Sequence, residues 1–316
     1  MNKLLCILLC LCLILPLTSG CTQRERSDKL QILCTVFPLY DWVRNIVGSS
    51  ETVEVSLLIT NGSDLHSYQP SAEDIVRISS ADLFFYVGGS SDAWVEETLR
   101  TQKSNARVDI KMTELPEIRL YDICAETSED HRDHDHGGTD EHVWLSLFNA
   151  KTAAAYLTDR ISELDAEHAD TYRQNFTAYA SSLDALDQAY AALVSKVAEP
   201  RLLCADRFPF VYLAEDYGIA YACAFEGCST DAEASPETIS RLASILDQYA
   251  LSTIVTTERP TAGLAESVRN ASSAKNQTIL TLNSMQSVTQ KDMDNGTEYL
   301  TVMQQNLEAL REILGA

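Results

Sequence analysis

The sequence predicts an α/β protein of two lobes, each with a parallel sheet flanked by helices, joined by one long, rigid backbone helix. Short apolar segments rich in β-branched and aromatic residues alternate with helical patterns in both halves, as in parallel sheets whose strands are connected by helices. The 316 residues also exceed one average domain,. A continuous run of helix-forming residues separates the two halves,.

The first half opens with a β-rich segment at 31–37 that leads into a helical pattern at 38–47. Further strands are expected at 53–59 and 81–87, with a helix at 72–79 between them,. The alternation predicts a parallel sheet in a lobe that covers 22–165.

The middle of the chain, 150–198, has apolar residues at helical spacing and must hold one or two long helices,. A helix over 169–197 would be roughly 40 Å long, which makes 166–198 the expected link between the lobes. The second lobe, 199–316, repeats the alternation, with strands at 202–205, 220–225, 253–257 and 278–282 and helices at 210–217, 236–249, from 262, and at 298–314.

The first 21 residues have the form of a processing segment. Met1-Asn2-Lys3 precedes an apolar run at 4–17, and Thr18-Ser19-Gly20-Cys21 follows,. A run of about 14 apolar residues is too short to span a bilayer as an ordinary helix, and small residues before a cysteine resemble the cleavage site of bacterial lipoproteins. We therefore expect a signal peptide at 1–21, lipid on Cys21, and an extracytoplasmic protein anchored to the cell membrane.

The composition restricts the partners of the protein. A formal charge of −22 repels nucleic acid and attracts cations,. The alternative is that the acidic surface only keeps the protein soluble. Cysteines outside the leader number five, at 34, 124, 204, 223 and 228. An odd number leaves at least one thiol unpaired, and because no Cys-x-x-Cys occurs, a redox motif and a zinc ribbon have no support.

Two of the six histidines stand where strands give way to loops. His66 lies in a polar turn directly after the 53–59 strand, and His142 lies where an acidic loop returns to an apolar segment. Loops at the carboxyl ends of parallel strands bind ligands. Imidazole suits Zn²⁺ and related ions, with a carboxylate or another histidine completing the shell.

Four motifs resemble one family in order and spacing: Phe37-Pro38-Leu39-Tyr40-Asp41, His66-Ser67-Tyr68-Gln69-Pro70, Ala81-Asp82-Leu83-Phe84-Phe85-Tyr86 and His142-Val143-Trp144-Leu145-Ser146. They are similar to those of the zinc and manganese solute-binding proteins of ABC importers, over most of 32–314. The resemblance implies a monomeric receptor that captures Zn²⁺, alternatively Mn²⁺, and delivers it to the permease and ATPase of an importer. It also implies that His66 and His142 are the first two metal ligands.

The resemblance fails at the other two ligand positions. The third position, five residues before Tyr212, holds Arg207, whose guanidinium cannot bind a cation. The fourth holds Asn283, in a loop without a charged side chain.

Candidates to complete the shell are Asp206, Glu258 and, less favoured, Cys228, with Glu226 and Glu233 also near the cleft. Each has an alternative role. Asp206 would pair with Arg207 or cap a helix, Glu258 would pair with Arg259, and Cys228 would form a disulfide.

The segment 126–141 is almost entirely acidic residues, histidine and glycine. It resembles the mobile His/Asp-rich loop of the family, which implies metal capture by His131, His134 and His136 and favours zinc over manganese. The alternative is a solvated insert without function.

An enzyme is not expected, because His-Glu-x-x-His, Gly-x-Ser-x-Gly and glycine-rich phosphate loops are absent from the sequence,. Two alternatives to transport stay open: a surface adhesin on the same fold, and a degenerate receptor whose altered second lobe no longer binds metal. Loss of growth under zinc starvation on deletion would support transport, whereas unchanged growth with lost attachment would support adhesion.

Overall fold

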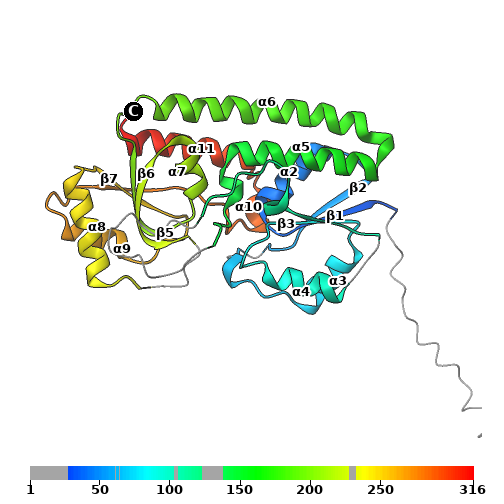
Figure 1. Cartoon of the computed structure of the whole chain (residues 1–316), viewed down its shortest axis with the longest axis horizontal. Coiled ribbons are helices and arrows are strands. Elements are labelled where there is room, and N and C mark those ends of the chain that lie inside the picture. The colour runs from blue at the N-terminus through cyan, green and yellow to red at the C-terminus, as the bar shows by residue number, and fades with distance from the viewer. Residues whose placement is uncertain (1–27, 61, 64, 103–105, 123–137, 228–232) are drawn as a thin grey trace, which may run out of the picture.

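The computed structural model describes residues 28–60, 62–63, 65–102, 106–122, 138–227 and 233–316. Two lobes lie side by side, and one long helix, α6 (Ala169–Val194), runs along the top of both (Figure 1). Each lobe contains a four-stranded sheet in which every pair of neighbouring strands is parallel. The predicted two-lobed α/β fold is confirmed.

The first sheet has the strand order β2-β1-β3-β4. Its strands are β1 (Leu30–Cys34), β2 (Val53–Leu57), β3 (Leu83–Tyr86) and β4 (Val108–Lys111). All four residues of β3 are buried, because helices cover both faces of a parallel sheet. The helical elements of this lobe are α2 (Phe37–Val47), η1 (Leu65–Ser67), α3 (Ala72–Ser80), α4 (Ala93–Thr101), η2 (Met112–Glu114) and η3 (Val143–Leu145).

The second sheet repeats this topology, with the order β6-β5-β7-β8. Its elements are β5 (Arg201–Phe208), α7 (Val211–Tyr217), β6 (Ala220–Glu226), α8 (Pro236–Gln248), β7 (Thr253–Thr256), α9 (Leu264–Ala271) and β8 (Thr278–Thr281). In both sheets the order reverses beside the first strand, and ligands bind outside the carboxyl ends of strands at such a reversal.

The predicted helical region forms two helices, α5 (Leu147–Leu164) and α6, with the short turn η4 (Ala166–His168) between them. Helix α6 packs on α2, α5 and the last helix, α11 (Tyr299–Leu314). Tyr190 of α6 is fully buried, and its hydroxyl donates to the carbonyl oxygen of Met303 at 2.6 Å. The helix is therefore held along its length, which limits bending between the lobes.

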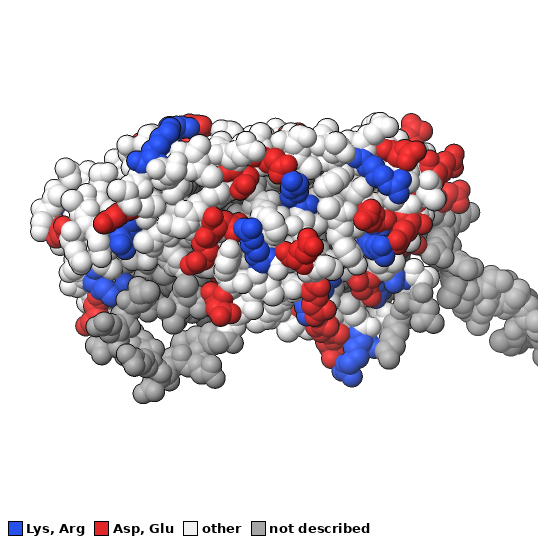
Figure 2. Space-filling model, turned by 45° about the horizontal axis from the view of Figure 1, so that its top comes forward, with Lys and Arg blue, Asp and Glu red and all other residues white. Residues whose placement is uncertain are grey.

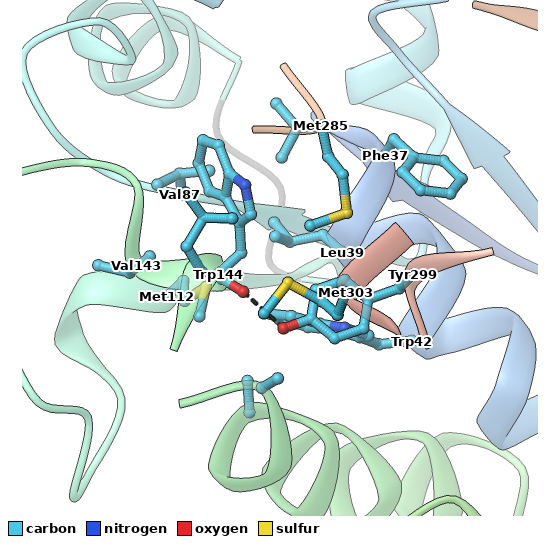
Figure 3. Close-up of a cluster of buried hydrophobic side chains, with 14 of the residues drawn as sticks. Phe37, Leu39, Trp42, Val87, Met112, Val143, Trp144, Met285, Tyr299 and Met303 are labelled. Carbon is cyan, nitrogen blue, oxygen red and sulfur yellow. Dashed lines mark hydrogen bonds between the residues drawn. The ribbon is translucent and has the colours of Figure 1, made fainter. Parts of the chain in front are cut away.

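The chain returns to the first lobe after β8, through α10 (Gln290–Asp294) and α11. Figure 3 shows Met285, Tyr299 and Met303 in one buried cluster with Phe37 and Trp42 of α2. The rings of Trp42 and Tyr299 meet edge to face, with their centroids 5.3 Å apart. The end of the chain thus contributes to the core of the first lobe.

The first predicted strand is shorter than expected, because β1 ends at Cys34 and α2 already begins at Phe37. Helices α4 and α10 and strand β4 were not predicted. β4 lies at the edge of its sheet and has only one buried residue, so it lacks the continuous apolar run that marks a central strand.

The surface charges do not form one large field on the face shown in Figure 2, where acidic and basic side chains are interspersed. Within the described ranges, no helix is both long enough and apolar enough to cross a membrane.

Candidate metal-binding site

Two imidazole rings meet between the lobes. His66 lies in η1, after β2, and His142 directly precedes η3. Their Nε2 atoms are 3.3 Å apart, although 76 positions separate the residues in the chain. The sequence predicted both as metal ligands, and the structure brings them together.

The separation of the two nitrogens fits a tetrahedral zinc ion. Zinc–nitrogen bonds of about 2.0–2.1 Å at a tetrahedral angle would place two ligand nitrogens about 3.3–3.4 Å apart. Two lone pairs that face each other at this distance repel unless a proton or a cation lies between them. The spacing therefore fits either an N–H···N hydrogen bond between the rings or a cation bound by both of them.

Asp140 orients His142. One carboxylate oxygen, Oδ1, accepts from the backbone N–H of His142 and is also bonded to ring atom Nδ1, both at 2.8 Å. Both side chains are completely buried. A carboxylate on one ring nitrogen holds the proton there and leaves the other lone pair free for a metal. Sequence analysis gave Asp140 no such role, although its place two residues before His142 was visible.

The backbone around Asp140 is itself fixed. Its N–H donates to the carbonyl oxygen of Tyr121 at 2.9 Å, and its carbonyl oxygen accepts from the Tyr212 hydroxyl at 2.8 Å. Tyr212 belongs to α7, so the second lobe helps to place the carboxylate that orients His142.

Opposing effects act on the pKa of His142. Burial lowers it, but the Asp140 carboxylate with its hydrogen bond, the charge of Glu141 and the nearby polar side chain of Gln286 together raise it above its ordinary value. The ring is thus surrounded by groups that stabilise positive charge, which is the electrostatic requirement of a cation site.

The backbone of the second lobe approaches the pair at Gly227. A Cβ atom there would lie 2.8 Å from the carbonyl oxygen of Phe208, 3.1 Å from Cε1 of His142 and 3.2 Å from Oδ2 of Asp140. Only glycine allows so close an approach. The residue after β6 therefore closes one side of the site.

The loop after β8 supplies a residue that sequence analysis missed. Gln286 interacts with His142, and Oε1 of Gln286 is buried. Because an amide carries no charge, Gln286 was not among the charged ligands considered for this loop. The loop also binds the first lobe directly, because Nε1 of Trp144 donates to the carbonyl oxygen of Ser284 at 2.9 Å.

Glu258, two residues after β7, holds the same loop. Its carboxylate accepts from the N–H of Ser284 at 2.9 Å, from the Ser284 hydroxyl at 2.8 Å and from the Ser287 hydroxyl at 3.2 Å. Glu258 also lines a cavity of about 380 Å³ between the lobes, together with Ser67, Arg207 and Gln286. This cavity is adjacent to the histidine pair, since Ser67 follows His66 and Gln286 reaches His142.

Asp206 has a different place. It is 1% exposed, and its carboxylate accepts from the N–H and hydroxyl groups of both Thr257 and Thr261, and from the N–H of Arg207. These bonds connect the end of β5 to the loop after β7. The structure does not bring Asp206 into contact with either histidine.

The other residues that the sequence suggested as ligands lie away from the histidine pair or outside the described residues. Asn283 uses Oδ1 to accept from the N–H of Met285, and Glu233 is exposed. Outside the described residues lie Cys21, His131, His134, His136 and Cys228. The cysteines within the described ranges, Cys34, Cys204 and Cys223, are all buried. In the part of the chain that the structure describes, no group of three or more His, Cys, Asp or Glu side chains is arranged to hold a metal.

Comparison with known proteins gives a consistent family. Residues 32–313 match the family model of ZnuA, described as zinc-uptake complex component A, periplasmic. The chain is 31% identical over 318 aligned residues to the zinc-binding lipoprotein AdcA of Streptococcus pneumoniae, covering 99% of this chain and 61% of that relative. It is 27% identical to the high-affinity zinc uptake system protein ZnuA of Bacillus subtilis, covering 92% of this chain and 89% of the relative.

A solved structure agrees with these relatives. The Zn(II)-bound ZnuA-like domain of Streptococcus pneumoniae AdcA superposes with a TM-score of 0.73 at 28% identity, covering 91% of this chain and all of that domain. The chain thus spans about three-fifths of full-length AdcA and corresponds to this one domain. The chain belongs to the ZnuA family of periplasmic zinc-uptake components.

Proposed function

We propose that this protein is an extracytoplasmic receptor that captures Zn²⁺ between its lobes and delivers it to an ABC importer. The observation that carries the proposal is the pair of Nε2 atoms of His66 and His142, which lie 3.3 Å apart with Asp140 on the far side of one ring. Two lone pairs at tetrahedral spacing suit zinc.

Binding in this site would be stabilised by buried negative charge. Asp140 and Glu141 are 0% and 2% exposed, and each has one carboxylate oxygen without a hydrogen-bond partner among the described residues. Anions in a medium of low dielectric attract a cation more strongly than in water. A dication at the histidine pair would offset both charges, which supports metal capture at this site.

The candidates for the remaining ligands are ranked by how readily their side chains can reach the cavity between the lobes. Glu258 comes first, because it lines the cavity between the lobes. Asp206 comes next, although its carboxylate already accepts from Thr257 and Thr261. Cys228, outside the described residues, is the third candidate.

The cellular setting of the receptor follows from the same reading. Lipid on Cys21 would hold a monomer at the outer face of the membrane, and the permease and ATPase of the importer would impose release. His131, His134 and His136 would collect zinc and load it into the buried site. The relatives named for zinc binding and zinc uptake support this assignment.

Metal content tests the proposal. Purified wild-type protein loaded with equimolar Zn²⁺ and Mn²⁺ should retain about one zinc per chain by mass spectrometry of the metal, and zinc should raise its melting temperature. His66→Ala and His142→Ala should each lose most of the bound zinc. The surface variant His168→Ala, whose ring is 36% exposed, serves as the matched histidine control.

The same assay ranks the other ligands. Asp206→Ala, Cys228→Ala and Glu258→Ala should lose zinc only where the side chain binds the ion, and intact melting curves of the metal-free variants would separate ligation from misfolding. Full zinc content in both His66→Ala and His142→Ala would refute the receptor. Preferential retention of manganese would support a metal receptor whose cargo is Mn²⁺ instead of Zn²⁺.

A further inference from the structure

Glu141 lies beside His142 in the chain but acts on a different part of the site. Its side chain is 2% exposed and extends to the loop between β3 and α4. There, Oε1 accepts from the backbone N–H of Ser91 at 2.9 Å and from the Ser90 hydroxyl at 2.5 Å. The carboxylate thus fixes this loop, which lies beside His66.

Ser91 connects the loop to the other imidazole. Its hydroxyl is bonded to Nδ1 of His66 at 2.5 Å, on the side of the ring opposite the atom that faces His142. An oxygen partner on Nδ1 sets the orientation of the ring and the nitrogen that is left for a metal. His66 therefore depends on Ser91, whose backbone depends on Glu141.

The two neighbouring carboxylates thus divide the site between them. Asp140 is bonded directly to Nδ1 of His142, and Glu141 reaches Nδ1 of His66 through Ser91. We propose that Glu141 is a positioning residue, which holds the His66 ring for metal binding through Ser91. This inference rests on the proposed function, because it takes both histidines as ligands.

The residues around Glu141 leave room for its side chain to reach Ser90 and Ser91. A Cβ atom on Gly89 would overlap the Glu141 side chain, so the loop needs glycine there to let the carboxylate pass. The second oxygen, Oε2, is buried without a hydrogen-bond partner among the described residues. Such a group costs free energy unless positive charge lies nearby, and zinc at the histidine pair would supply that charge.

Zinc affinity of two variants tests the link, measured by competition with a chelator of known affinity. Glu141→Leu removes both carboxylate oxygens at a similar side-chain size, and Ser91→Ala removes the hydroxyl that reaches His66. Each should weaken zinc binding about ten- to hundredfold, the range for partners that orient a metal ligand. The double variant should bind about as weakly as the weaker single variant, since both act along one path.

Asp92→Asn is the matched control. Asp92 is also buried in this loop, and its carboxylate accepts from the N–H of Gly88 without a described bond to Ser91 or His66. This variant should keep the zinc affinity within about threefold while it changes the melting temperature of the metal-free protein.

Nuclear magnetic resonance of the zinc-loaded protein, with ¹⁵N-labelled histidine, separates positioning from a general structural role. Glu141→Leu should shift the ring nitrogens of His66 more than those of His142. Unchanged affinity in Glu141→Leu or in Ser91→Ala would overturn the proposal, as would losses that add in full in the double variant. If Glu141→Leu does not fold, Ser91→Ala alone decides. Full zinc content in both His66→Ala and His142→Ala would instead refute the proposed function itself.

Discussion

At the residue scale, buried carboxylates organise this protein, and each has specific donors. Asp206 joins the end of β5 to the loop after β7 through Thr257 and Thr261, while Asp140 orients His142. A buried acid is tolerated when hydrogen bonds or charge compensate it. Asp41 is less well compensated, which gives a testable pH dependence.

Asp41 is 4% exposed, and Oδ2 accepts from the N–H of Tyr299 and the amide of Asn45, both at 3.1 Å. Burial raises the pKa of Asp41 to about 6, an effect that the Tyr299 hydrogen bond offsets only in part. Because the folded pKa exceeds the unfolded one, the stabilising contribution is present below about pH 4 and is lost as the pH rises through 6. The free energy of unfolding of wild type relative to Asp41→Asn should therefore fall by up to about 3 kcal/mol over this interval.

Urea unfolding of metal-free protein at several pH values measures this difference. Asp292→Asn is a control of opposite sign, since hydrogen bonds from Thr289 hold the pKa of Asp292 below its ordinary value. The advantage of wild type over that variant should grow as the pH rises through 4. Parallel profiles for wild type and Asp41→Asn would contradict the prediction.

At the scale of elements, the long helix is stable because it is buried along one side. Propensity alone leaves short isolated helices marginal in water, and in proteins the packing of an apolar face supplies most of the stability of a helix. Tyr172, Leu183, Tyr190 and Leu193 of α6 are each at most 2% exposed. They secure the helix against both α5 and the last helix of the chain.

Leu183→Ala in α6 should lower the free energy of unfolding by about 2–5 kcal/mol, the cost of removing a buried leucine side chain. Ser182→Ala changes the adjacent, exposed position and should stay within about 0.5 kcal/mol of wild type. Both are measured by urea unfolding, and zinc stoichiometry should stay at the wild-type level in each. A loss below about 1 kcal/mol for Leu183→Ala would mean that this side of the helix is not part of the core.

At the scale of the whole molecule, side chains join the lobes as well as the helix. Asp216 of α7 accepts from Arg119 at 3.2 Å, from the Tyr121 hydroxyl at 3.0 Å and from the Ser146 hydroxyl at 2.5 Å. On the other side of the cleft, Arg259 donates to the carbonyl oxygen of Gly62 at 2.7 Å. Contacts of this kind limit the movement of one lobe against the other.

Asp216→Asn should weaken the junction, because one carboxylate serves three donors and an amide cannot accept from all of them. We expect a loss of about 1–3 kcal/mol in stability and faster backbone hydrogen exchange at 119–122, which exchange measured by mass spectrometry would detect. Asp187→Asn is the control. Asp187 of α6 accepts from Tyr217 of α7, the helix that also carries Asp216, but has no described bond to the first lobe. Equal exchange at 119–122 in both variants would contradict a special role of Asp216.

Much of the fold could be predicted because its signals are local. The alternation of strands and helices, and the long helical region, follow from periodicity within each segment. Edge strand β4 was not predicted, because a half-exposed strand has too few apolar residues to stand out in the sequence. The place of His66 and His142 after strands also indicated a shared cleft, since such loops lie at one edge of a sheet.

Local patterns along the chain are enough to predict the fold class and the two imidazoles, because strand periodicity and loop position are properties of neighbouring residues. Which groups surround the imidazoles depends on how distant segments pack. Ser91 and Glu141 are 50 positions apart, and Gln286 reaches His142 from the other lobe. Such contacts depend on strand order and on how the lobes close, and no local pattern records either.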